Sequence, residues 1–168
     1  MQKTGVGDHI IDSDKIYVIF DIKNQKDVSG KDREYVYYKP IASLERDTGL
    51  IGSIPIDNFT KAGLRGLLSK KEAGNFLNEI STASEMEGID YKGYKEILYA
   101  NDPIKTLPLL KTLWGKKKAE GESFSRVDRE IVEVTMKHLV EELGFVTKTP
   151  LLKMRQEIEA ELNKAAKV

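Results

Sequence analysis

Several features that mark common protein classes are missing from this chain of 168 residues. It has no cysteine, which excludes a disulfide framework and a thiolate metal site. No apolar run approaches the roughly 20 residues that cross a bilayer, and residues 1–9 lack the apolar segment of a signal peptide. We therefore expect a cytoplasmic protein without a membrane partner.

An excess of charge of one sign is also missing, because 27 basic residues balance 27 acidic ones. No global field points to a nucleic-acid or membrane partner, so any DNA-binding footprint has to be local. The two histidines, His9 and His138, are far apart in the sequence, and no grouping of Ser, His and acid stands out. The sequence predicts no catalytic site, no metal site and no cofactor, and we expect a protein that is not an enzyme.

The chain changes character near Gly66, with strand patterns before it and helix patterns after it. Segments 16–22, 34–39 and 50–54 are short runs rich in β-branched and aromatic residues, separated by polar turns. Strands first and helices second predict an α+β protein with two modules, residues 1–66 and 67–168. We expect a small antiparallel sheet or barrel followed by an all-α domain.

In the second module, capping patterns in the sequence predict where several helices begin. Ser69 and Glu72 form a capping-box pattern, which predicts a helix to about residue 81. A short helix is expected at 90–100. The next helix begins either at Asp102-Pro103, where proline suits the first helical position, or at Thr106, and the pattern does not choose between them.

Residues 109–144 predict two antiparallel helices joined at Gly121, and a last helix follows Pro150. Ser125 is the expected N-cap of the second helix of the pair, and Gly144 is its expected C-cap. Helical spacing predicts a wide buried face on that helix. Its members are Val127, Ile131, Val132, Val134, Met136, Leu139 and Leu143.

Residues 91–118 combine seven lysines with two acidic residues and several aromatic rings. Lysines pair with phosphates and rings stack on bases or wedge between them, so the segment fits a nucleic-acid surface. The alternative is a solvated helix surface with aromatic rings in the core. Trp114 stands at helical spacing from Leu107, Leu110 and Leu113, which favours a core position for this ring.

A series of motifs resembles the CarD family of bacterial transcription regulators. GDHII at 7–11 is similar to the family's first strand, G-D-x-V-V. IPIDN at 54–58, GLR at 63–65 and SKKE at 69–72 resemble its VP-x-x-N, G-(L/V)-R and capped-helix passage. KTLW at 111–114, GES at 121–123 and VEEL at 140–143 resemble its helical hairpin, and the spacing agrees over residues 5–146.

The resemblance implies a Tudor-like N-terminal barrel that docks on the β subunit of RNA polymerase. It also implies a helical domain that contacts promoter DNA at the upstream edge of the melted bubble, and we expect a monomer. We place the polymerase contacts at Lys26, Gly52, Ser53, Ile54 and Pro55, with docking by strand addition. The DNA-binding candidates are Tyr91, Lys92, Tyr94, Lys95, Lys116, Lys117, Lys118, Arg126 and Arg129.

Three departures from the family pattern shape this hypothesis. The family's Y-P-x-H-G turn after the first strand is replaced by DSDKI at 12–16. Its polymerase-facing arginine falls on Ser53, and its wedge tryptophan, expected near 87–91, is missing. Tyr91 or Tyr94 can serve as a shallower wedge. The rival hypothesis is a protein-interaction module that keeps the fold and does not bind DNA.

Overall fold

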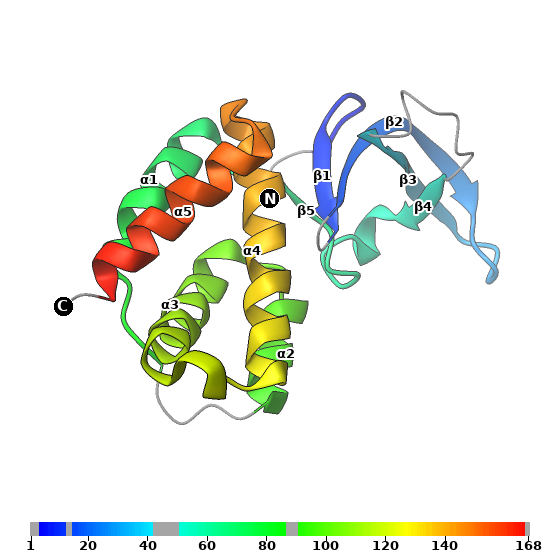
Figure 1. Ribbon diagram of the computed structural model, residues 1–168. Coiled ribbons are helices and arrows are strands. Elements are labelled where there is room, and N and C mark those ends of the chain that lie inside the picture. Colours follow the sequence, from blue (N-terminus) through cyan, green and yellow to red (C-terminus); the bar gives the residue numbers. More distant parts are fainter. Residues whose placement is uncertain (1–3, 13–14, 42–50, 87–90, 167–168) are drawn as a thin grey trace. The chain divides into compact units, whose positions relative to one another are not determined.

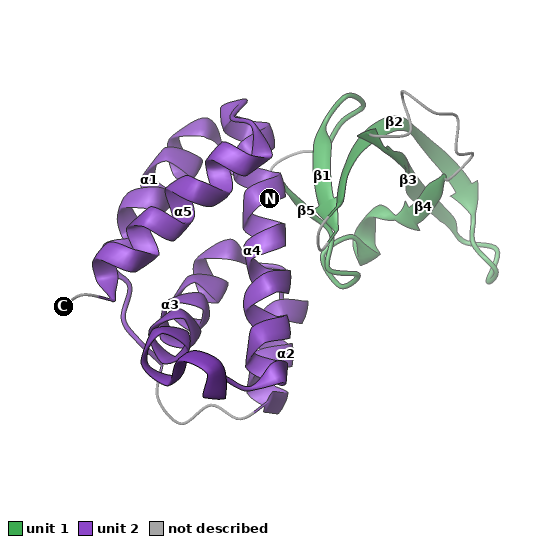
Figure 2. Ribbon diagram, in the orientation of Figure 1, with its two compact units in different colours: residues 1–67 green, residues 68–168 purple. Residues whose placement is uncertain are grey.

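The computed structural model describes residues 4–12, 15–41, 51–86 and 91–166. Figure 1 shows strands at the beginning of the chain and helices after them, so the protein is α+β. The chain divides into two compact units, residues 1–67 and 68–168 (Figure 2). Among the helices of the described ranges, none has the length and apolar character to span a membrane.

Unit 1 is built on one antiparallel sheet with the strand order β4-β3-β2-β1-β5. Within the described residues no pairing joins β4 to β5, so the sheet is open and the expected closed barrel is not confirmed. The strands are β1 (His9–Asp12), β2 (Lys15–Lys26), β3 (Asp32–Pro40), β4 (Gly52–Pro55) and β5 (Arg65–Gly66), and the 3-10 helix η2 (Ile56–Asn58) follows β4.

The predicted strands at 16–22 and 34–39 lie inside β2 and β3. Leu50, the expected start of the third strand, lies outside the described residues, and β4 begins at Gly52. The two-residue strand β5 was not predicted, because so short a segment carries no periodicity. β3 ends at Pro40, since proline lacks the N–H that a central ladder needs.

The sheet of unit 1 has a core face and an opposite face. Ile10, Ile19, Val36, Phe59 and Leu64 form the buried cluster on the core face. Between Ile19 and Asp21 the pairing of β2 with β3 shifts by one residue, which leaves Phe20 as a β-bulge. A bulge re-aims side chains, and this one places Phe20 beside the ring of Tyr37 with 6.3 Å between the centroids.

The described residues of unit 2 form five α-helices. Ser69 Oγ accepts from the Glu72 N–H while the Glu72 carboxylate accepts from the Ser69 N–H, which confirms the capping box. Asp102 caps the third helix and Pro103 takes its first position, which settles the alternative with Thr106. The helices are α1 (Lys70–Thr82), α2 (Tyr91–Tyr99), α3 (Pro103–Glu120), α4 (Arg126–Thr147) and α5 (Leu151–Ala165), with a 3-10 turn η3 (Gly121–Ser123) between α3 and α4.

The hairpin of α3 and α4 turns at Gly121, where φ is 57°, a left-handed value that glycine tolerates. Ser125 Oγ accepts from the Asp128 N–H and caps α4 as predicted. The predicted C-cap at Gly144 is wrong, because α4 runs on to Thr147 and the left-handed cap is Lys148. Gly144 has a different role: a Cβ there would lie 3.0 Å from Leu151 Cδ2 and 3.1 Å from the Thr149 carbonyl oxygen.

The core of unit 2 is closed by the last helix, which lies beside α1 in Figure 1. Met154, Ile158 and Leu162 of α5 join the buried cluster that α1, α3 and α4 form. On α4 the expected face is correct at Ile131, Val132, Met136, Leu139 and Leu143. It is wrong at Val127 and Val134, which are 45% and 42% exposed, because the other helices cover only one side of α4.

Candidate interaction surfaces

The candidate polymerase contacts on β4 lie at an edge of the sheet, since β4 pairs only with β3 among the described residues. The side chain of Ser53 is exposed, while Ile54 packs against the core cluster. Gly52 is required by packing, because a Cβ there would lie 2.4 Å from Cζ of Tyr38. One side of β4 therefore has no strand partner among the described residues, which is the geometry that strand addition uses.

Lys26 lies apart from that edge. It ends β2 opposite Asp32, whereas β4 pairs with Tyr35 to Tyr38 further along β3. The turn after Lys26 is held by Asp27, which accepts from Ser29 and Lys31 and pairs with Arg33 at 2.9 Å. The structure thus groups the four β4 residues along the middle of β3 and leaves Lys26 at the turn end of the β2–β3 hairpin.

The exposed face of α2 carries rings and lysines. Tyr91 is 51% exposed, Lys92 and Lys95 are exposed, and the Lys95 Nζ lies 4.7 Å from the centroid of the Tyr91 ring. Tyr94 instead packs against the core of unit 2. Of the two tyrosines that can replace the missing tryptophan, only Tyr91 is available at the surface; residues 87–90 of that expected position lie outside the described residues.

Tyr99 is a surface residue that was missing from the predicted site. Its side chain is 77% exposed, the most exposed aromatic ring of the described residues. Residues 91, 95 and 99 are four apart, and each step of four turns an α-helix by only about 40°. The sequence therefore already indicated that Tyr99 shares one face of α2 with Tyr91 and Lys95.

The three lysines at the end of α3, Lys116 to Lys118, have different partners. Lys116 Nζ lies 2.5 Å from Oδ2 of the buried Asp128 of α4. This hydrogen bond raises the pKa of the Lys116 ammonium, and the nearby Tyr94 contributes a smaller effect in the same direction. Lys116 thus joins α3 to α4, and its charge is largely neutralised.

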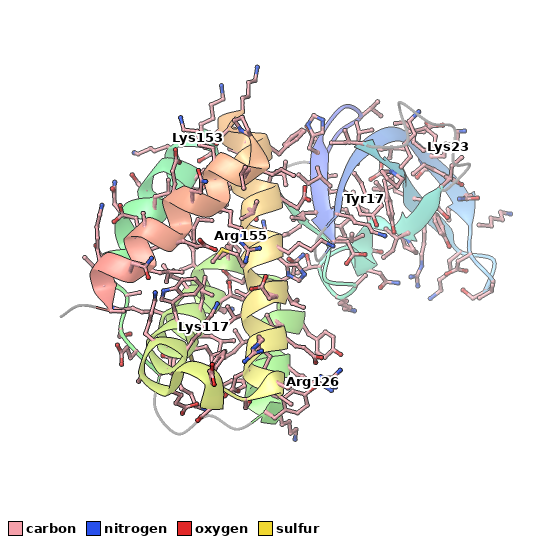
Figure 3. All side chains as sticks on the ribbon, viewed as in Figure 1. Tyr17, Lys23, Lys117, Arg126, Lys153 and Arg155 are labelled. Carbon is pink, nitrogen blue, oxygen red and sulfur yellow. The ribbon has the colours of Figure 1, made fainter. Side chains whose placement is uncertain are left out.

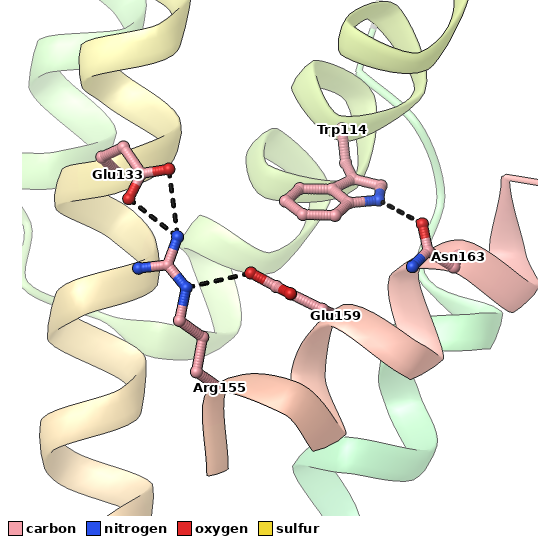
Figure 4. A network of polar contacts seen from close by, with 5 residues as sticks. All are labelled: Trp114, Glu133, Arg155, Glu159 and Asn163. Atoms are coloured by element: carbon pink, nitrogen blue, oxygen red, sulfur yellow. Dashed lines mark hydrogen bonds and ion pairs between the residues drawn. The ribbon is translucent and has the colours of Figure 1, made fainter. Parts of the chain in front are cut away.

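Lys117 and Lys118 stand over the ring of Trp114, with Nζ 4.6 Å and 5.9 Å from its centroid. Trp114 is 5% exposed, and its Nε1 donates to Asn163 Oδ1 at 3.1 Å (Figure 4). The prediction of a core position for this ring is confirmed. The ammonium groups of the two lysines lie over the ring as cation–π partners, and Lys118 is exposed while Lys117 is half-buried.

The two arginines of α4 lie in its first turn. Figure 3 labels Arg126, which is exposed and pairs with Glu130 at 3.4 Å. Arg129 donates to the carbonyl oxygen of Phe124 at 3.4 Å. The Lys116–Asp128 pair brings this turn next to the end of α3, whereas Lys117 and Lys118 lie over Trp114, which bonds to Asn163 of α5.

Acidic residues accompany the basic candidates along the chain and lower the net positive charge of these segments. Glu96 lies on α2, Glu120 and Glu122 follow the lysine run, and Glu130 is bound to Arg126. No group of three or more His, Asp or Glu that could hold a metal ion occurs in the part of the chain that the structure describes. The arrangement is suited to weak, local contacts with phosphates or with a protein.

Comparison with protein-family models finds no match, and no curated protein matches the sequence.

Proposed function

We propose that the protein is a CarD-like regulator that docks on the β subunit of RNA polymerase through β4 and contacts promoter DNA with unit 2. The observation that carries the proposal is the edge position of β4, which presents the segment that resembles the family's docking strand. The order of a sheet unit and then a helical unit supports it. Under this proposal, the open sheet of unit 1 corresponds to the family's Tudor-like domain.

The docking half of the proposal predicts a gain of binding. Restoring the family's arginine with Ser53→Arg adds a charge-assisted contact at an exposed edge position, so capture of the polymerase β lobe by the full-length protein should rise about threefold or more. Thr60→Arg adds the same charge at another exposed position of unit 1 and serves as the control. Equal capture by wild type and both variants would contradict docking through β4.

The DNA half rests on Lys117 and Lys118, which have no acidic partner among the described residues. Replacing both with Gln should weaken binding to duplex DNA and lower the slope of log K against log salt by about 1.8, because each phosphate contact contributes about 0.9. The control is the same change at Lys70 and Lys71, an exposed pair at the start of α1. Equal effects from the two pairs would mean that the end of α3 is not the contact.

A second candidate function is a protein-interaction module that does not bind DNA. The engagement of Lys116 with Asp128 and of Arg126 with Glu130 favours it. If the wild-type protein captures the β lobe but shows no duplex binding at low salt, this second function replaces the first.

A further inference from the structure

The face of the sheet opposite the core of unit 1 carries aromatic rings and lysines that the proposed function does not use. Directly opposite residues of an antiparallel pair share a face, and Tyr37 stands opposite Asp21 on β2 and Ser53 on β4. The bulge adds Phe20 to this face. We call the set Phe20, Tyr37, Lys23 and Lys39 the aromatic face.

Each ring of the aromatic face has a cation beside it. Lys39 Nζ lies 5.5 Å from the centroid of Phe20, and Lys23 Nζ lies 5.5 Å from that of Tyr37. Phe20 is 37% exposed, and the side chain of Lys23 is 63% exposed although it also pairs with Asp21 at 2.6 Å. Gln25 donates to the hydroxyl oxygen of Tyr37 and orients this ring.

We propose that the aromatic face binds single-stranded nucleic acid, with Phe20 and Tyr37 stacking on bases and Lys39 and Lys23 pairing with phosphates. Proteins bind single strands with this combination of exposed rings and flanking cations, because every base has a flat π face and every nucleotide a phosphate. A duplex hides the faces of its bases, so this site discriminates against it.

A protein strand fits this face less well. β3 has a neighbour on each side at Tyr37, whereas β1 lies beside only residues Lys15 to Val18 of β2. At Tyr37 a peptide therefore has no edge to extend, in contrast to β4, and over the aromatic face it meets side chains. The chemistry on offer is ring faces and ammonium groups, which matches bases and phosphates.

The test is fluorescence anisotropy of the full-length protein with a labelled oligothymidylate, compared with a duplex of equal length. Wild type should bind the single strand, and Phe20→Ala should weaken this binding at least about fivefold, the lower end of the loss for one stacked base. Phe20→Leu keeps apolar bulk at the bulge and removes the ring, so it should weaken binding similarly even if the alanine variant misfolds.

Two matched controls isolate the site. Val28→Ala removes an exposed apolar side chain from the β2–β3 turn and should leave the dissociation constant unchanged. Lys39→Gln should weaken binding and lower its salt dependence, whereas Lys31→Gln, an exposed lysine of the same turn, should have little effect. Circular dichroism of each variant verifies the fold.

The proposal is overturned if wild type does not bind the oligothymidylate, or if folded Phe20→Leu and Tyr37→Leu proteins bind it as wild type does. Failure here is separable from failure of the proposed function. Lys117→Gln with Lys118→Gln tests duplex binding by unit 2, and Ser53→Arg tests capture of polymerase. A negative outcome in either of these experiments does not change the result for single-strand binding by unit 1.

Discussion

At the residue scale, glycines in helices act in opposite ways according to what surrounds them. Gly144 is buried in α4, where the start of α5 approaches so closely that a methyl group would contact Leu151 and the Thr149 carbonyl. Gly74 of α1 is exposed, and a Cβ there would meet nothing within 4 Å. The two positions form a natural pair for experiment.

We expect Gly144→Ala to lower the free energy of unfolding by about 1–3 kcal/mol, because overpacking outweighs the better helix propensity of alanine. Gly74→Ala should raise it by up to about 1 kcal/mol, since only propensity changes. Urea titration followed by circular dichroism measures both. Stabilisation by Gly144→Ala would show that α5 can move away from α4 at little cost.

The tyrosines of α2 show that the sequence pattern does not determine which ring is buried. Tyr91, Tyr94 and Tyr99 look alike in the sequence, yet only Tyr94 packs into the core. The exposure of the others depends on which side of α2 faces α3, and this is decided by packing between helices. Lys116 is a similar case, because its partner Asp128 is brought to it by the turn at Gly121.

At the element scale, the Lys116–Asp128 pair fastens α3 to α4. The buried carboxylate loses its partner if the lysine is replaced, so Lys116→Met should lower the free energy of unfolding by about 1 kcal/mol at neutral pH. This estimate lies between exposed and fully buried pairs, since the lysine side chain is 41% exposed. Lys105→Met, which breaks a more exposed pair with Asp102, should cost less.

The pH dependence of the Lys116 effect follows from its pKa, which is raised in the folded protein above 10.5 by the hydrogen bond to Asp128. The stabilisation is complete below the unfolded pKa and is lost as pH rises through the folded pKa. The difference between wild type and Lys116→Met should therefore shrink in alkaline solution above pH 10.5. A difference that stays constant there would mean that packing of the side chain, and not its charge, is responsible.

Starts of elements were easier to predict than their ends. Ser69, Asp102 and Ser125 cap their helices through bonds to residues two or three positions away, so the local sequence contains the whole signal. The end of α4 depends on Leu151 of the next helix, which the local sequence around Gly144 does not contain. For the same reason the exposure of Val127 and Val134 was missed.

At the scale of the whole molecule, each unit has a buried cluster of its own. In unit 2 all members except Phe124 come from its helices. Arg155 of α5 binds Glu133 of α4 and Glu159 of its own helix at 2.9 Å each (Figure 4). The order of strand and helix patterns was sufficient to predict the α+β class. The open sheet was not predictable, because closure depends on how far each strand curves.

We expect the fragment 68–168 to fold when it is expressed alone, because its core needs no side chain from unit 1. The only tryptophan of the chain, Trp114, lies in this unit and reports on it specifically. Its emission should match that of the full-length protein and shift to longer wavelength in one cooperative step with urea. A solvent-exposed emission spectrum in buffer would contradict this expectation.

The bulge at Phe20 also has a consequence for how the chain folds. On one side of it Tyr17 to Ile19 pair with Tyr38 to Pro40, and on the other side Asp21 to Lys26 pair with Asp32 to Tyr37, one residue out of step. A uniform ladder can slide by two residues and keep its faces. Here a slide by two residues would separate Phe20 of the bulge from the ring of Tyr37, so the bulge favours a single alignment of the longest hairpin.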